Sequence, residues 1–187
     1  MLNSLPLNKV KINDNYWNHY INLVGKEIIP YQWEVLNDNV ADAAPSYCIK
    51  NFKIAAKEAQ GQRLGVVFQD TDVAKWLEAV AYSLEINPNP DLEKTADEVI
   101  ELIGKAQCED GYINTYYTLV ENGERWQNLT MGHELYTAGH IIEAAVAYYT
   151  ATGKRRFLDI VCKFADLICK EFSPNGSQPH GIPGHQE

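Results

Sequence analysis

Apolar residues recur along most of this chain with the spacing of a helix. In residues 70–84 they fall at positions 73, 76, 77, 80, 81 and 84, which form one stripe along an α-helix. Pro88 and Pro90 interrupt this pattern, and the Asn89–Pro90 pair is typical of the start of a new helix. A second apolar stripe predicts another helix, which ends at the turn of residues 108–111. Together the two helices predict a hairpin.

The same pattern recurs further along the chain. Apolar spacing predicts a helix over residues 130–151, a break at Gly153, and a second helix over residues 154–171. Glu143 lies 65 positions after Glu78, and at this offset the apolar positions of the two helix pairs coincide. The chain is therefore interpreted as a repeat of helical hairpins.

A third helix pair, over residues 16–29 and 46–60, precedes these two. Only residues 63–68 are a candidate for a short extended segment. Repeated hairpins stack into curved or closed arrays, so the predicted fold class is all-α. Three hairpins do not close a ring and would leave an apolar face uncovered. We therefore expect residues 1–187 to be the N-terminal portion, or a shortened version, of a larger protein.

Composition and charge narrow the classes of partner. The chain has 25 acidic and 16 basic residues and a net charge of −9, so it is not expected to bind nucleic acid. No apolar run is long enough for a signal peptide or a membrane span, which predicts a cytoplasmic protein with no membrane partner. The four cysteines form no CxxC pair, and the helical spacing of Cys162 and Cys169 predicts small core residues.

The segment HELYTAGH, residues 133–140, carries two histidines on one predicted helix. Seven helical steps are about 20° short of two turns, so His133 and His140 lie on one face about 10 Å apart. A metal ion with ligand bonds of about 2 Å does not bridge that distance. The histidines are then either substrate contacts or satisfied core residues, and the second case is the more frequent.

Two other segments combine polar groups with a constrained backbone. FQDTD, residues 68–72, places an amide and two acids at a helix start, where capping explains Asp70 but not Gln69. HGIPGH, residues 180–185, carries His185 on a loop shaped by glycine and proline, where functional and structural roles are about equally frequent. The aromatic run in CEDGYINTYY suits either a sugar site or packing.

Six segments carry a resemblance to a known family: LPLNKVKINDNYW (5–17), IPYQWEVLND (29–38), GVVFQDTDVAKWLEAVAYSL (65–84), QCEDGYINTYY (107–117), GHELYTAGHIIEAAVAYYTATG (132–153) and HGIPGHQE (180–187). In this order they resemble the N-terminal part of the beta-L-arabinofuranosidases of glycoside hydrolase family 127. The resemblance spans nearly the whole chain. It implies helical hairpins forming part of an (α/α)6 toroid, incomplete in this chain, and β-sandwich domains after the toroid in full-length members.

The resemblance also implies substrate contacts and a reaction. His133 in HELY and His185 in GHQE would contact arabinose within an arabinose-containing oligosaccharide. Gln32 in IPYQ would belong to the same subsite, and Gln69 and Asp70 would lie near the same cavity. The family's reaction resembles a retaining double displacement, in which a zinc-held cysteine thiolate is the nucleophile and a glutamate is the acid/base.

The family's reacting groups lie beyond the position of Glu187, and none of the four cysteines here matches its zinc ligands. The resemblance therefore implies no catalytic residue, metal ligand or cofactor in this chain, and zinc only in the full-length family. We expect the isolated chain to be inactive, with the missing C-terminal half as a possible partner.

Two alternatives stay open. A toroid glycosidase or lyase of the unsaturated-glucuronyl-hydrolase type would use carboxylates, with Asp70, Asp72 or Asp110 as acid/base candidates. A non-catalytic helical-repeat module would instead bind a partner at its open edge. Loss of activity in Asp70→Asn or Asp110→Asn, with none on cysteine alkylation, would favour the carboxylate enzyme.

Overall fold

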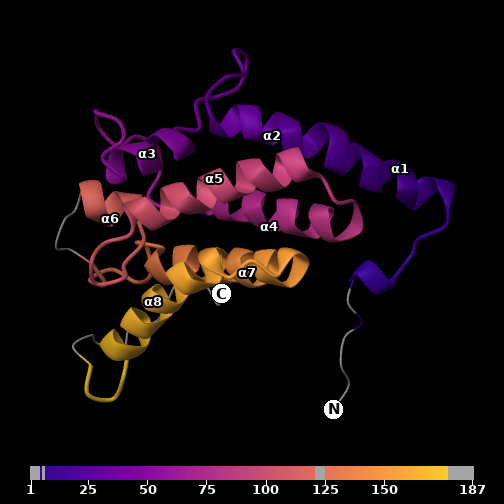
Figure 1. The fold of residues 1–187 in the computed structure, drawn as a ribbon. Helices are drawn as coiled ribbons and strands as arrows, with labels where there is room; N and C mark the ends of the chain where they lie inside the picture. The colour runs from indigo at the N-terminus through magenta and orange to yellow at the C-terminus, as the bar shows by residue number, and fades with distance from the viewer. Residues whose placement is uncertain (1–4, 6, 121–124, 177–187) are drawn as a thin grey trace.

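A computed structural model describes residues 5, 7–120 and 125–176, and within these ranges every regular element is a helix. The elements are η1 (Leu7–Lys9), α1 (Asn15–Leu23), η2 (Val24–Ile28), α2 (Ile29–Leu36), α3 (Cys48–Ala55), α4 (Asp70–Ile86), α5 (Pro90–Ala106), α6 (Thr115–Leu119), α7 (Glu134–Thr152) and α8 (Arg156–Glu171). Figure 1 shows them as stacked helices. The all-α prediction is confirmed.

The first helix continues well past its expected end at residue 29. In Figure 1, α1, η2 and α2 cross the top of the molecule as one nearly continuous helix that reaches Leu36. Pro30 lies in its middle and has no N–H to donate to the carbonyl four residues earlier. The chain accommodates Pro30 with a turn of π-helix at Val24–Ile28, where the N–H of Ile29 donates to the carbonyl of Val24.

The two hairpins predicted from the 65-residue offset are present as α4–α5 and α7–α8. The Asn89 side chain caps α5, as expected, by accepting from the N–H groups of Asp91 and Leu92. Gly153 ends α7 in the left-handed region with φ 73°. The hairpins meet along α4 and α7, where buried small residues such as Ala81, Ala138, Ala144 and Ala145 bring the helix axes close together.

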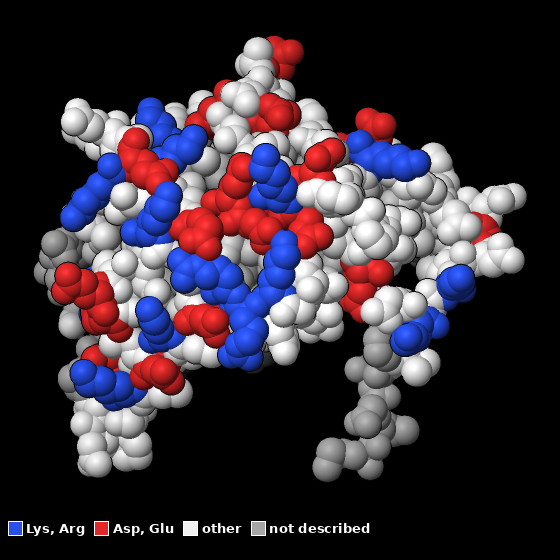
Figure 2. Space-filling model, in the orientation of Figure 1, with Lys and Arg blue, Asp and Glu red and all other residues white. Residues whose placement is uncertain are grey.

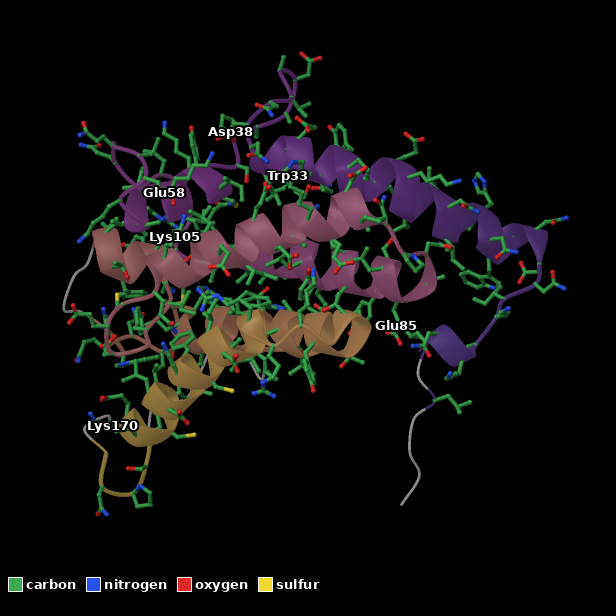
Figure 3. The ribbon with its side chains drawn as sticks, viewed as in Figure 1. Trp33, Asp38, Glu58, Glu85, Lys105 and Lys170 are labelled. Carbon is green, nitrogen blue, oxygen red and sulfur yellow. The ribbon has the colours of Figure 1, made fainter. Side chains whose placement is uncertain are left out.

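The outer helices α5 and α8 present charged side chains to solvent. Figure 2 shows acidic and basic residues intermingled over α5 in the centre of this face. The ammonium group of Lys105 on α5 donates to Glu58, which follows α3, over 2.6 Å, and Figure 3 labels both residues. This face therefore has the character of an exposed outer layer, as the sequence pattern of the second helix in each hairpin predicts.

Three local predictions were wrong. The helix expected over residues 46–60 ends at Ala55. Residues 63–68 form no strand: the segment is irregular up to residue 66 and then enters a turn. Arg63 is buried there, and its guanidinium donates to the carbonyl groups of Gly65 and Val66. Cys162 and Cys169 are exposed, because the buried stripe of α8 runs through other positions, namely Phe157, Ile160, Val161, Phe164 and Leu167. Across the described ranges, no helix has the length and apolarity to cross a membrane.

Candidate functional site

A cavity of about 500 Å³ opens between the α1–α2 segment and the N-terminal half of α4. Gln32 on α2 and Gln69 at the start of α4 both line it, together with Asp72 and Lys75. The Trp76 indole lies beneath, where it donates to the carbonyl of Ile29 over 3.1 Å and so fixes α4 against α2. The structure therefore brings together two of the residues that the sequence singled out.

The part of the cavity wall formed by Gln69, Asp72 and Lys75 is polar and already hydrogen-bonded. The Gln69 amide donates to the Asp72 carboxylate over 2.8 Å, and its oxygen accepts from the N–H of Val66 over 3.3 Å. Partial burial raises the pKa of Asp72, while Lys75 and the Gln69 amide act in the opposite direction. An amide, a carboxylate and an ammonium group thus lie side by side, a set that can both donate to and accept from hydroxyl groups.

Residues 44–46 form another wall of the cavity, and Asp38 fixes the loop that carries them. Asp38, labelled in Figure 3, accepts from the N–H of Ser46 over 2.6 Å and from the N–H of Tyr47 over 3.1 Å. The backbone of Asp38 is left-handed with φ 60°, a conformation that aspartate tolerates better than most residues. One side chain therefore shapes the loop by satisfying two of its backbone donors.

His133 immediately precedes α7 and lies within a cluster of rings. Its ring centroid is 4.9 Å from that of Phe68 and 5.8 Å from that of Tyr136. Tyr136 in turn lies 4.6 Å from His140, so a tyrosine ring separates the contacts of the two histidines along the helix. The Glu143 carboxylate lies 3.5 Å from Nδ1 of His140. The prediction that both histidines lie on one helix was wrong: His140 is in α7, whereas His133 precedes it with a left-handed backbone, φ 53°.

Lys75 links this ring cluster to the cavity. Its Nζ donates to the Tyr136 hydroxyl over 2.8 Å and lies 5.1 Å from the centre of that ring, which places the ammonium group at the hydroxyl edge. Phe68, which contacts His133, directly precedes Gln69 in the chain. His133 and the cavity are thus neighbouring parts of one region, at the N-terminal ends of α4 and α7.

Asp70 lies elsewhere: it is buried and faces the connection between the two hairpins. Its carboxylate accepts from the N–H and from the hydroxyl of Thr115, each over 2.6 Å. Burial raises the pKa of Asp70, while the Thr115 hydrogen bonds and the Arg63 guanidinium lower it. The sequence predicted that Asp70 or Thr71 caps α4, and this was wrong, because Gln69 occupies the position before the helix and makes no side-chain capping bond.

The described residues do not fit a zinc site. Within residues 5, 7–120 and 125–176, no group of three or more His, Cys, Asp or Glu side chains could hold a metal ion. Cys48 is buried, with its sulfur 3.3 Å from the carbonyl oxygen of Gln69, and burial raises its pKa to about 12. A thiol with that pKa stays protonated and is a poor nucleophile.

Three further residues bear on the predicted site: His185, Asp110 and Lys75. His185 lies outside the described residues. Asp110 accepts from the Arg125 guanidinium over 2.7 Å and from the N–H of Tyr112 over 3.1 Å, so it organises a turn and does not line the cavity. Sequence reasoning missed Lys75. Its signal was the helical spacing from Gln69 through Asp72, which places all three within about a third of the helix circumference.

Comparison with known proteins identifies the family. Residues 9–187 match the beta-L-arabinofuranosidase GH127 catalytic domain. The chain is 37% identical to a non-reducing end beta-L-arabinofuranosidase of Bifidobacterium longum, over 95% of this chain and 30% of that protein. The chain therefore belongs to the GH127 family, which favours the first of the three hypotheses over the carboxylate enzyme and the binding module.

Solved structures agree. A GH127 beta-L-arabinofuranosidase from Geobacillus stearothermophilus T6 is 61% identical with a TM-score of 0.93, over 95% of this chain and 28% of that one. A second GH127 beta-arabinofuranosidase is 36% identical with a TM-score of 0.86, over 97% of this chain and 29% of that one. This chain thus corresponds to the N-terminal part of such proteins and spans less than a third of their length.

Proposed function

We propose that residues 1–187 supply part of the arabinose-binding pocket of a beta-L-arabinofuranosidase catalytic domain, and that the groups that react lie in the remainder of that domain. One observation carries the proposal: Gln32 and Gln69, from separate helices, line one cavity. The membership of the GH127 family supports the reaction type. A zinc-held thiolate and a cytoplasmic location complete the proposal for the full-length protein.

The polar wall of the cavity suits a neutral sugar. The Gln32 and Gln69 amides can each donate to and accept from hydroxyl groups, and Asp72 adds an acceptor while Lys75 adds a donor. Opposite charges 3 residues apart on α4 leave no strong net field that would select a charged substrate. We expect a furanose ring to bind with its hydroxyl groups against this wall.

The histidines and Asp70 have different parts in this proposal. His133 would contact the arabinose from the ring cluster beside the cavity, with His185 as a second contact. Asp70 would act indirectly. Its hydrogen bonds to Thr115 fix the first turn of α4, and so the backbone that carries Gln69. The downstream part of the protein would close the pocket.

Sugar binding by the chain itself tests the pocket. L-arabinose titrated into isotopically labelled chain should shift NMR signals of Gln32, Gln69 and His133. Gln69→Ala and His133→Ala should each weaken binding about tenfold, the loss expected for one well-placed hydrogen bond. Gln60→Ala and His19→Ala are matched controls at positions that do not line the cavity. Equal effects of the site variants and the controls would contradict the pocket assignment.

Activity assays test whether the reacting groups lie outside residues 1–187. The isolated chain should not turn over a nitrophenyl beta-L-arabinofuranoside. A chimera should do so if residues 1–187 replace the matching part of the 61% identical Geobacillus enzyme. Turnover by the isolated chain that survives a metal chelator would overturn the proposal, as would an inactive but folded chimera.

A further inference from the structure

Glu134, the first residue of α7, has a carboxylate that is enclosed by protein and 1% exposed. It accepts from the N–H of Trp126 over 2.7 Å and from the Tyr112 hydroxyl. An ionised carboxylate is rarely buried so completely unless hydrogen bonds hold it. Both of its partners precede α7 in the chain, so Glu134 ties the start of that helix to the segment leading up to it.

That segment ends in His133, whose backbone is left-handed with φ 53°. Trp126 is also left-handed, with φ 66°. Gly132 leaves no space for a side chain, because a Cβ there would lie 2.2 Å from the Tyr117 hydroxyl oxygen and 2.5 Å from the carbonyl of Asn128. A non-glycine residue keeps a left-handed backbone only where its surroundings impose it, and such positions concentrate at functional sites.

Tyr112 is a rigid partner for Glu134. Its ring packs edge-on against Phe164 at 5.4 Å and against Trp126 at 5.2 Å, and the Arg125 guanidinium lies 3.9 Å above its centre. Burial raises the pKa of Tyr112, and the Glu134 carboxylate raises it further, so the phenol keeps its proton and remains a donor. Glu134 is therefore anchored to the hydrophobic core and not to a mobile surface group.

We propose that Glu134 is a positioning residue for His133: by holding Trp126 and Tyr112, it imposes the left-handed turn that places the His133 ring against Phe68, beside the cavity. The inference that this positioning serves sugar binding rests on the proposed function, in which His133 contacts arabinose. In this proposal the buried Glu134 fixes the orientation of His133, the residue directly before it in the chain.

A matched pair of tyrosine variants tests this without removing the buried charge. Tyr112→Phe deletes the hydroxyl bonded to Glu134. Tyr148→Phe deletes a hydroxyl that donates to Asp97 over 2.7 Å. Tyr148 lies on α7, 14 residues after Glu134. Both rings are buried and both substitutions keep the ring, so both variants should remain folded, which urea unfolding checks. Only Tyr112→Phe should weaken the NMR cross-peaks between the His133 and Phe68 rings and raise the L-arabinose Kd, about fivefold.

Substitution of Glu134 itself is the second test of the proposal. Glu134→Ala should abolish the ring cross-peaks, whereas Glu134→Gln should restore most of them, because its amide oxygen still accepts from Trp126. Unchanged cross-peaks in a folded Glu134→Ala chain would overturn the proposal. Equal losses of the His133–Phe68 cross-peaks in Tyr112→Phe and Tyr148→Phe would overturn it too. If the parent chain binds no L-arabinose, the proposed function fails, while the cross-peaks still decide whether Glu134 holds His133.

Discussion

The hairpins α4–α5 and α7–α8 share a plan but differ at the point where each inner helix begins. Their elements coincide within a residue or so at an offset of 65. The residue before α4, Gln69, is right-handed with φ −56°, whereas the residue before α7, His133, is left-handed with φ 53°. Both inner helices then start with a buried acid, Asp70 or Glu134.

These two acids each hold the segment that connects the hairpins, at different points along it. Asp70 accepts from the N–H of Thr115, and Glu134 from the N–H of Trp126. The paired helices repeat because each must bury one apolar stripe against the other hairpin. The helix starts are free of that constraint, so they can differ, and two of the residues that we propose to contact the sugar, Gln69 and His133, lie there.

The largest expected effect comes from the core of the repeat. Phe157 on α8 and Leu92 on α5 hold matching positions, but Phe157 is fully buried and Leu92 only partly. Phe157→Ala should lower the free energy of unfolding by about 4 kcal/mol. Leu92→Ala should lower it by about 1–2 kcal/mol, since the exposed side of the residue leaves no cavity. Equal losses in urea denaturation would show that the two outer helices are packed alike.

A somewhat smaller effect is expected at the acid that opens α4. Asp70→Ala removes the acceptor for two Thr115 groups in the interior, so the free energy of unfolding should fall by about 3 kcal/mol. Asp91→Ala, an exposed acid in the first turn of α5, should cost about 0.5 kcal/mol through the helix dipole. Chemical denaturation of both variants compares them directly, and a small loss in Asp70→Ala would remove the anchoring role argued above.

The connections within the hairpins give a third test. Gly153 ends α7 with φ 73°, and a Cβ there would meet no atom within 4 Å, so only backbone strain opposes a side chain. Gly153→Ala should cost about 1 kcal/mol. Asn87 ends α4 with φ −132°, a conformation open to any residue, so Asn87→Ala should be nearly neutral. Thermal unfolding of the two variants should therefore separate the two connections, and equal shifts would contradict this difference.

Apolar periodicity was sufficient to predict most of the fold. It placed α4, α5 and α8 within a few residues, because each has one buried stripe and a clear start or stop signal. It failed for α2, since the first helix was expected to end at residue 29 but continues to Leu36 after a π-turn at Val24–Ile28. It also placed Cys162 and Cys169 in the core, although the wider phenylalanine and isoleucine stripe of α8 leaves both outside.

The candidate site was only partly predictable. Gln69 stood out because helix capping left its side chain unexplained, and the structure places it on the cavity with Gln32. That two helices far apart in sequence would share a cavity depends on tertiary packing, which periodicity does not specify. The same holds for Glu134: nothing in the sequence shows that its carboxylate turns back to Tyr112 and Trp126 instead of outward to solvent.

The smallest expected effect lies where the two outer helices meet. The Arg156 guanidinium on α8 donates to both carboxylate oxygens of Glu101 on α5, over 2.6 and 2.8 Å, and these hydrogen bonds lower the pKa of Glu101. Both side chains are about half exposed, so Glu101→Gln should cost about 0.5 kcal/mol or less at pH 7. Glu98→Gln, which removes a looser pair with Lys94 inside α5, is the matched control.

The pH dependence of that small difference identifies its source. A lowered pKa in the folded state means that the carboxylate stabilises the fold fully above the ordinary value of 4.5, and that this contribution is lost as the pH falls through the lowered value. Urea unfolding of wild type and Glu101→Gln should thus differ at pH 7 and converge near pH 3, and 1 M salt should narrow the gap at pH 7. A gap that persists in acid would mean that Glu101 joins the hairpins through packing of its side chain and not through its charge.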